Sequence, residues 1–179
     1  MRYTHHSEQW LPYPVELVFA FFANPENLPR LMPPWQKARI EEATFAPPPP
    51  TDETLLLKSI AGVGTRLTVS FRPFPFSPIR IPWEAEITDF VWNDHFCDRQ
   101  LRGPFAHWNH CHSVRSQTTR QTQANNAGTL LSDNIEYEMP FGKFGNLANR
   151  LIIARQLRNT FAYRQTRAAD LLSRIFARG

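Results

Sequence analysis

The sequence predicts an α+β domain in which a curved antiparallel sheet of about six to seven strands wraps around a long C-terminal helix. Three observations support this fold class. A first strand is followed by two short helical segments, then by strand-like segments with short connections, and the apolar residues of the last segment recur at helical spacing. With 179 residues and 42% hydrophobic content, residues 1–179 are expected to form a single domain.

The first elements are a strand over residues 2–11 and a helix that begins after Pro14. Proline suits the first turn of a helix, and Asn24 with Pro25 is a typical stop. The apolar side chains in between have the spacing of a buried helix face: Val15, Val18, Phe19 and Phe22. A second, shorter helical turn is expected before Pro33.

About six further strands are expected in the middle of the chain. Their expected ranges are 35–45, a strand that begins near Gly64, then 83–92, 95–102, 105–115 and 129–139. The turns at residues 93–94 and 103–104 are so short that the strands they join must run antiparallel. The polar segment 116–128 is expected to be a loop. Residues 47–50 are four prolines, which predict a stiff surface loop, with a ligand for a proline-recognition domain as the alternative.

The last segment, from about Gly142, is expected to form one helix about 50 Å long. Its apolar stripe consists of Phe144, Leu147, Leu151, Ala154, Leu157, Phe161, Ala168, Leu172 and Ile175. Arg164 and Gln165 interrupt this stripe where the helix should cross the sheet. The segment carries Lys143 and seven arginines against one acid, Asp170. A solvated helix face is the expected reason, and contact with nucleic acid or anionic lipid is the alternative.

Composition excludes several classes of protein. No apolar run approaches the roughly 20 residues that span a bilayer, so no stable membrane insertion is expected. The first residues lack the apolar stretch of a signal peptide, which predicts a cytoplasmic protein. Two cysteines are too few for a disulfide framework, and they lack zinc-finger spacing. No RNA-binding signature is present, so no nucleic-acid partner is expected, while a partner protein or enzyme is possible but not identified by the sequence.

The segment DRQLRGPFAHWNHCH, residues 98–112, concentrates groups that can bind or transfer protons. If residues 103–105 form the turn, strand alternation sets three inward-facing pairs opposite one another: Phe96 and His112, Asp98 and His110, Gln100 and Trp108. The following hairpin sets two more pairs opposite one another: His112 and Asp133, Trp108 and Tyr137. We expect Asp98 to pair with His110 and His112 to pair with Asp133, because unpaired burial would cost about 1–3 kcal/mol for each group.

The same register places Cys97 opposite Cys111 on the outer face, where we expect two neighbouring free thiols. On the inner face, the mixture of rings and hydrogen-bonding groups predicts the wall of a pocket. The candidate ligand-binding residues are Trp83, Phe96, Asp98, Gln100, Trp108, His110, His112, Asp133, Tyr137 and Arg164. A polar network that serves packing alone is the alternative.

Enzymatic and metal-binding functions are weaker interpretations of the same patch. A histidine next to a carboxylate can act as a general base, and the candidates are His110, His112, Asp98 and Asp133. The absence of a nucleophile motif such as G-x-S-x-G favours binding over catalysis. The pair His110-x-His112 with an aspartate also has ligand types that suit a metal ion, but the pattern is weak. No metal and no cofactor are therefore expected.

Several segments resemble the START-like superfamily, also called SRPBCC, which has the helix-grip fold. They are PVELVFAFFANPENL, WEAEITDF, FCDRQLRGPFAHWNHCHSV, DNIEYEMPFG and the terminal helix with FAYR. Within the superfamily, the sequence is most similar to a bacterial cyclase/dehydrase-like subgroup. The resemblance implies a cavity between the sheet and the C-terminal helix. It also implies binding or transport of a hydrophobic or amphipathic small molecule, such as a lipid, quinone or polyketide-like compound. The alternative is an enzyme of the polyketide cyclase or dehydratase type that uses a His–Asp pair in the same cavity.

Overall fold

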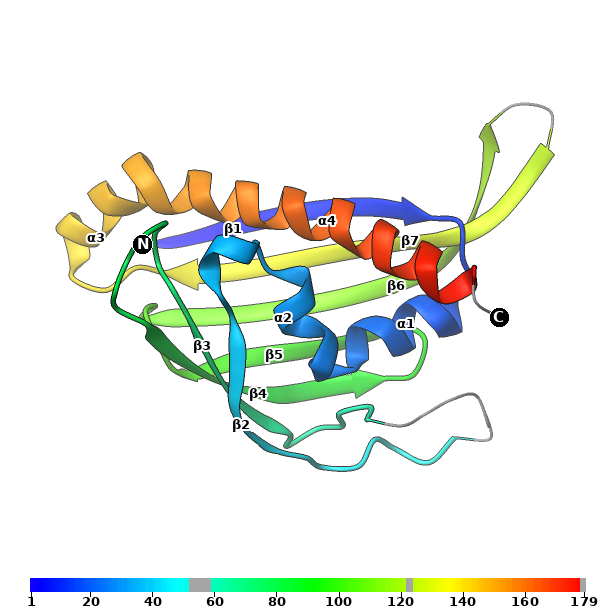
Figure 1. The fold of residues 1–179 in the computed structure, drawn as a ribbon, viewed down its shortest axis with the longest axis horizontal. Helices are drawn as coiled ribbons and strands as arrows, with labels where there is room; N and C mark the ends of the chain where they lie inside the picture. The colour runs from blue at the N-terminus through cyan, green and yellow to red at the C-terminus, as the bar shows by residue number, and fades with distance from the viewer. Residues whose placement is uncertain (52–58, 122–123, 178–179) are drawn as a thin grey trace.

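The computed structural model describes residues 1–51, 59–121 and 124–177. Within these ranges, seven strands form one antiparallel sheet in the order β1-β7-β6-β5-β4-β3-β2. The strands are β1 (Arg2–Leu11), β2 (Arg39–Thr44), β3 (Arg66–Phe71), β4 (Ile81–Val91), β5 (His95–Arg102), β6 (His107–Gln121) and β7 (Ala124–Glu138). Figure 1 shows the C-terminal helix along β1 and β7, with the short helices beside it on the same side of the sheet. This is the helix-grip fold that the sequence predicts.

The short helices follow β1 as expected. They are α1 (Val15–Ala23), the 3₁₀ turn η1 (Pro25–Asn27), α2 (Leu28–Leu31) and a second 3₁₀ turn, η2 (Pro34–Gln36). The expected strand 35–45 begins only at Arg39, because η2 occupies its first residues and Lys37 then takes a left-handed conformation with φ of 46°. Pro33 precedes this turn and Pro34 begins it, and neither proline has the backbone donor that a strand would need.

The prediction of a loop at residues 116–128 is wrong. β6 and β7 stay paired from Ser116 opposite Thr129 out to Gln121 opposite Ala124. This ribbon extends beyond the helices in Figure 1. Backbone pairing needs no apolar face, and threonines such as Thr118 and Thr119 favour extended backbone. The polarity of the segment therefore does not indicate a loop.

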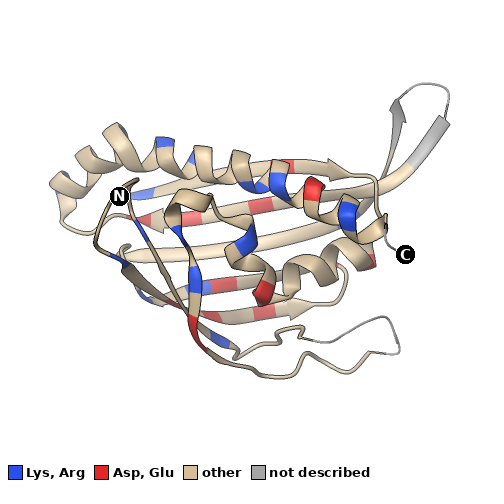
Figure 2. Ribbon diagram, viewed as in Figure 1, with Lys and Arg blue, Asp and Glu red and all other residues tan. Residues whose placement is uncertain are grey.

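The C-terminal helix is continuous but contains a π-helical turn. It consists of α3 (Gly142–Ala148), the π turn η3 (Asn149–Ile153) and α4 (Ala154–Phe176). The predicted stripe is buried at Phe161, Ala168 and Leu172, but Phe144 is 83% exposed and Leu151 65% exposed. Figure 1 shows the reason, because α3 projects past the end of the sheet. Basic positions recur along this helix, with a single acidic one (Figure 2).

Two apolar clusters fill the space between the sheet and the helices. One joins α1 to the C-terminal half of α4 and includes Phe19, Phe96 and Leu172. The other surrounds Trp108 and Phe161. Burial of each large side chain contributes about 1.5–3 kcal/mol, so these clusters account for much of the stability of the fold. Between them, β6 and β7 present a short band of polar residues rather than apolar ones.

The outer face of the β5–β6 hairpin carries Cys97 directly opposite Cys111, as the register predicts. The expectation of two free thiols is wrong, since the structure joins them in a disulfide. Their Cα atoms are 4.1 Å apart, and opposed residues point to the same face, so the two sulfurs lie within bonding reach. None of the helices in the described part of the chain has the length and apolarity needed to cross a membrane.

Candidate functional site

A cavity of about 290 Å³ lies between the sheet and the helices. Its walls are mostly apolar side chains from both layers, among them Phe22, Leu31, Val69, Trp83, Leu157 and Phe161. The polar band between the two apolar clusters supplies part of the same wall. The volume is near the lower end of the range for small-molecule sites, so the cavity suits a compact ligand.

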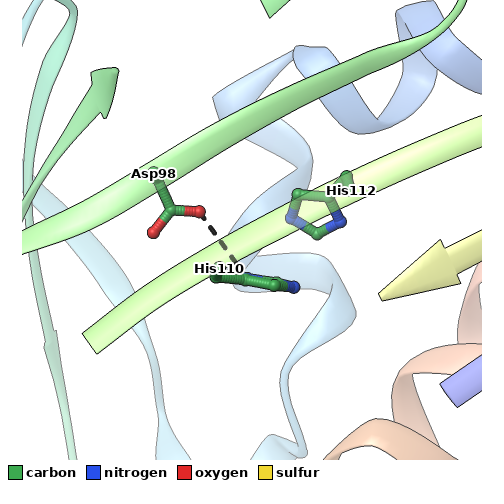
Figure 3. A group of neighbouring side chains, drawn as sticks. All are labelled: Asp98, His110 and His112. Carbon is green, nitrogen blue, oxygen red and sulfur yellow. Dashed lines mark ion pairs between the residues drawn. The ribbon is translucent and has the colours of Figure 1, made fainter. Parts of the chain in front are cut away.

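Three neighbouring strands, β5, β6 and β7, contribute the charged part of the polar band. Its members are Asp98, His110, His112 and Asp133, and Figure 3 shows the first three of them converging. His110 Nδ1 lies 3.6 Å from Asp98 Oδ2, and His112 Nδ1 lies 2.7 Å from Asp133 Oδ1, which confirms both predicted pairs. A contact that was not predicted joins His110 Nε2 to Asp133 Oδ1 at 3.1 Å. His110 therefore bridges the two carboxylates.

Burial sets the protonation of this cluster. His110, His112 and Asp133 are each less than 5% exposed. Burial, together with the neighbouring His110, lowers the pKa of His112 to about 3, so this ring is neutral near pH 7. Burial raises the pKa of Asp98, although His110, Arg164 and the Trp108 side chain oppose that shift. Burial would also raise the pKa of Asp133, but the histidines and Arg164 hold it well below its usual value.

Arg164 of α4 approaches the cluster from the opposite layer. Its guanidinium carbon lies 5.4 Å from the centre of the Phe22 ring and 5.5 Å from that of Phe161. One terminal nitrogen is 3.5 Å from His112 Nε2, and the buried Nε atom has no hydrogen-bond partner among the described residues. An ion pair with Asp98 or Asp133 was one expectation, but neither carboxylate lies within ion-pair distance of Arg164.

The structure separates the ten candidate residues into two groups. The cavity wall includes Trp83, Phe96, Asp98, Trp108, His110, His112 and Arg164. Asp133 lies behind both histidines, where it orients them. The Tyr137 hydroxyl donates to Asn149 Oδ1 at 2.9 Å and ties the sheet to the π turn. Gln100 donates to the Phe105 carbonyl at 2.7 Å. The expected pairing of Gln100 with Trp108 is wrong, because the β5–β6 ladder ends at Arg99 opposite Asn109 and Gln100 folds into the turn instead.

Comparison with known proteins places this cavity in a family. Residues 11–164 match the family described as polyketide cyclase / dehydrase and lipid transport. The chain belongs to this family. The family is part of the START-like, or SRPBCC, superfamily, which confirms the resemblance inferred from the sequence. Its description joins lipid transport with cyclase and dehydrase activities, and no curated protein matches the chain.

Solved structures with the same fold share little sequence with this chain. Protein CV1439 from Chromobacterium violaceum has a TM-score of 0.62 at 15% identity, with 94% of this chain and 96% of that chain covered. Norcoclaurine synthase from Thalictrum flavum, in complex with dopamine and hydroxybenzaldehyde, has a TM-score of 0.59 at 15% identity, with 97% and 88% covered. Protein TTHA0849 from Thermus thermophilus has a TM-score of 0.56 at 16% identity, with 94% and 99% covered. These likenesses show the fold alone.

Two residues next to the cluster were missed as site residues in this family member. His5 of β1 is partly buried, and its ring centre lies 5.0 Å from that of Phe161. Burial lowers the pKa of His5, and Asp133 opposes that shift. Phe161 was assigned only to the apolar stripe, yet it packs against His110 at 5.6 Å. Strand alternation could have revealed His5, since Tyr3, Ser7 and Gln9 share its inward face.

Asp98, His110 and His112 also have the residue types of a transition-metal site. Their ligand atoms lie within 4.8 Å of one another. However, both histidines already direct a nitrogen at Asp133, and the Arg164 guanidinium lies against the remaining nitrogen of His112. A nearby cation disfavours a second one, so this geometry supports a hydrogen-bonded network better than a metal centre.

Proposed function

We propose that the protein binds or transports a hydrophobic or amphipathic small molecule, of the lipid, quinone or polyketide kind, in the cavity between the sheet and the C-terminal helix. One observation carries this proposal. The cavity of about 290 Å³ has an apolar wall, and the cluster of Asp98, His110, His112 and Arg164 interrupts that wall. Apolar contact supplies affinity at about 25 cal/mol for each Å² removed from water, while a few placed polar groups fix the orientation.

The family supports the same function in coarser terms, because its description includes lipid transport as well as cyclase and dehydrase activity. The shape of the wall adds to this support. Trp83 and Trp108 meet edge to face at 4.7 Å between ring centres, and Phe105 packs against both. Such rigid rings form a flat-sided slot that suits a planar or ring-containing ligand.

A test of this function needs a neutral probe and a blocked cavity. We suggest isothermal titration calorimetry with 2-naphthalenemethanol on the wild type and on Val69→Trp, which would fill the cavity from its β3 wall. Val91→Trp is the matched control, because Val91 is 46% exposed and does not line the cavity. We expect at least tenfold weaker binding for Val69→Trp alone. Equal binding by all three proteins would place the probe outside the cavity and contradict the proposal.

Extraction of molecules that co-purify with the protein would name the ligand class. Native mass spectrometry of the purified protein, followed by organic extraction, should recover a lipid, quinone or polyketide-like compound if the cavity holds its ligand tightly. Recovery of only water-soluble polar compounds would argue against an apolar ligand.

Acid–base catalysis is the second candidate function, and the position of His110 favours it. This ring lines the cavity and is held between Asp98 and Asp133, as a general base would be. His112 is the poorer base, because its pKa of about 3 makes it weakly basic. If a cyclisation or dehydration substrate is found, its bell-shaped pH profile should be lost in His110→Ala. Unchanged turnover in that variant would exclude this mechanism.

A further inference from the structure

The surroundings of Arg164 differ from those of the other arginines near it on α4. Arg167 and Arg174 both pair with Asp170, and Arg158 is exposed to solvent. Arg164 instead lines the cavity, and none of the ion pairs in the described part of the chain includes it. Arg164 is partly buried and no carboxylate of the described residues pairs with it directly, so a ligand anion in the cavity would find an available cation.

Two aromatic rings hold the guanidinium in this position. Phe22 from α1 and Phe161 from α4 each lie about 5.5 Å from its central carbon, within the range of cation–π contact. Such contacts engage the faces of a guanidinium and leave its N–H edge available. The Nε atom, which has no hydrogen-bond partner among the described residues, belongs to that edge.

The groups around Arg164 do not neutralise it. His112 is the only side chain within hydrogen-bond distance in the described part of the chain, at 3.5 Å, and its ring is neutral near pH 7. The Asp133 carboxylate is taken up by contacts with His110 and His112. The Asp98 carboxylate lies beside His110, and it is not within ion-pair distance of Arg164. Neither carboxylate of the cluster therefore pairs directly with the guanidinium.

Resting on the proposed function, we propose that the ligand carries a carboxylate at its buried end and that Arg164 binds it. A carboxylate can accept two parallel N–H bonds from one guanidinium, which gives both affinity and a fixed orientation. The remainder of the ligand would then lie along the apolar wall toward Trp83 and Trp108. The preferred ligands are thus compact carboxylic acids with an apolar or ring-containing body.

Matched probes test the charge separately from the cavity. We suggest calorimetric titration of the full chain with 2-naphthoate and with neutral 2-naphthalenemethanol, which have the same ring system. Wild-type protein should bind the carboxylate at least tenfold more tightly than the alcohol. An alcohol that binds as tightly as the carboxylate would overturn the carboxylate proposal and leave the proposed cavity binding intact, whereas failure of both probes would contradict both proposals.

Substitutions then test Arg164 itself. Arg164→Met keeps much of the apolar stem but removes the charge, and Arg164→Lys restores the charge without the planar edge. We expect Arg164→Met to lose tenfold or more in affinity for 2-naphthoate with less than threefold change for the alcohol, and Arg164→Lys to recover part of the loss. Arg158→Met, exposed on the same helix, is the control and should bind like the wild type. Equal losses for both probes in Arg164→Met would show a structural role only and overturn the assignment.

Discussion

His112 makes the stability of the fold depend on acidity. Its pKa is about 3 in the folded protein, because burial and His110 disfavour the charged ring, against an unfolded value of about 6.5. Well above pH 6.5 the ring is neutral in both the folded and the unfolded state, so its protonation does not change the free energy of unfolding. As the pH falls from 6.5 toward 3, the unfolded chain takes up a proton that the folded chain refuses, and stability is lost. The loss approaches about 1.4 kcal/mol per pH unit below pH 6, and amounts to about 2.7 kcal/mol between pH 7.5 and 4.5.

Urea unfolding at intervals from pH 7.5 to 4.5 measures this loss. His112→Gln removes the titrating ring, so the free energy of unfolding of the wild type should fall by about 2–3 kcal/mol more than that of the variant across this range. His6→Gln is the matched control, because His6 is exposed on β1. The reasoning is refuted if the wild type and His112→Gln lose stability in parallel, since His112 would then have no depressed pKa in the folded state.

Three further outcomes follow from the same geometry. Asp133→Asn should lower the free energy of unfolding at pH 7 by about 1–3 kcal/mol, because two buried histidines lose their shared carboxylate; a change below about 0.5 kcal/mol in urea unfolding would contradict the network. Reduction of the Cys97–Cys111 disulfide, which closes a sequence separation of 14 residues, should lower the free energy of unfolding by about 3 kcal/mol. Thermal unfolding with and without dithiothreitol measures this effect, and equal melting temperatures would contradict it. Treatment with EDTA followed by buffer exchange should leave the melting temperature unchanged, and calorimetric titration with zinc ions should then show no stoichiometric binding. Tight zinc binding that is lost in His110→Gln would instead show that Asp98, His110 and His112 form a metal centre.

The register of the two central hairpins could be predicted from the sequence because two constraints agree. A two-residue period puts polar groups on one face only if the turn lies at residues 103–105, and the same register places Cys97 opposite Cys111. One slipped residue would move Asp98 and His110 to the outer face. Short turns and strict alternation thus specify most of the sheet before any tertiary contact is known.

The length of the ribbon and the exposure of α3 could not be predicted, because both depend on where the body of the protein ends. Residues 116–121 pair in a strand although the segment is polar, so its composition suggested a loop. Phe144 and Leu151 have core spacing, yet the helix is longer than the sheet beneath it. The hydrophobic pattern of a helix indicates which of its side chains could be buried. Whether they are buried depends on how far the sheet extends beneath the helix.

Within the site, the sequence placed the right residues on one face but not their detailed contacts. The pairs Asp98–His110 and His112–Asp133 follow from facing positions across strands. The additional bond from His110 to Asp133 depends on how the rings turn, since the diagonal positions are close enough only for particular rotamers. The lack of an ion pair at Arg164 is also a tertiary fact, because it depends on the crossing position of α4 over the sheet.

The polar band also has an energetic consequence. Four ionisable side chains separate two apolar clusters that would otherwise merge into one core. Replacing a buried ionic network with well-packed apolar side chains is often neutral or stabilising by about 1–4 kcal/mol, so packing alone gives little reason for this band. A function gives one, because the band lies on the wall of the cavity and Arg164 faces it with its charge unpaired. Its groups contact one another across the strands, and Arg164 adds a cation to the same wall.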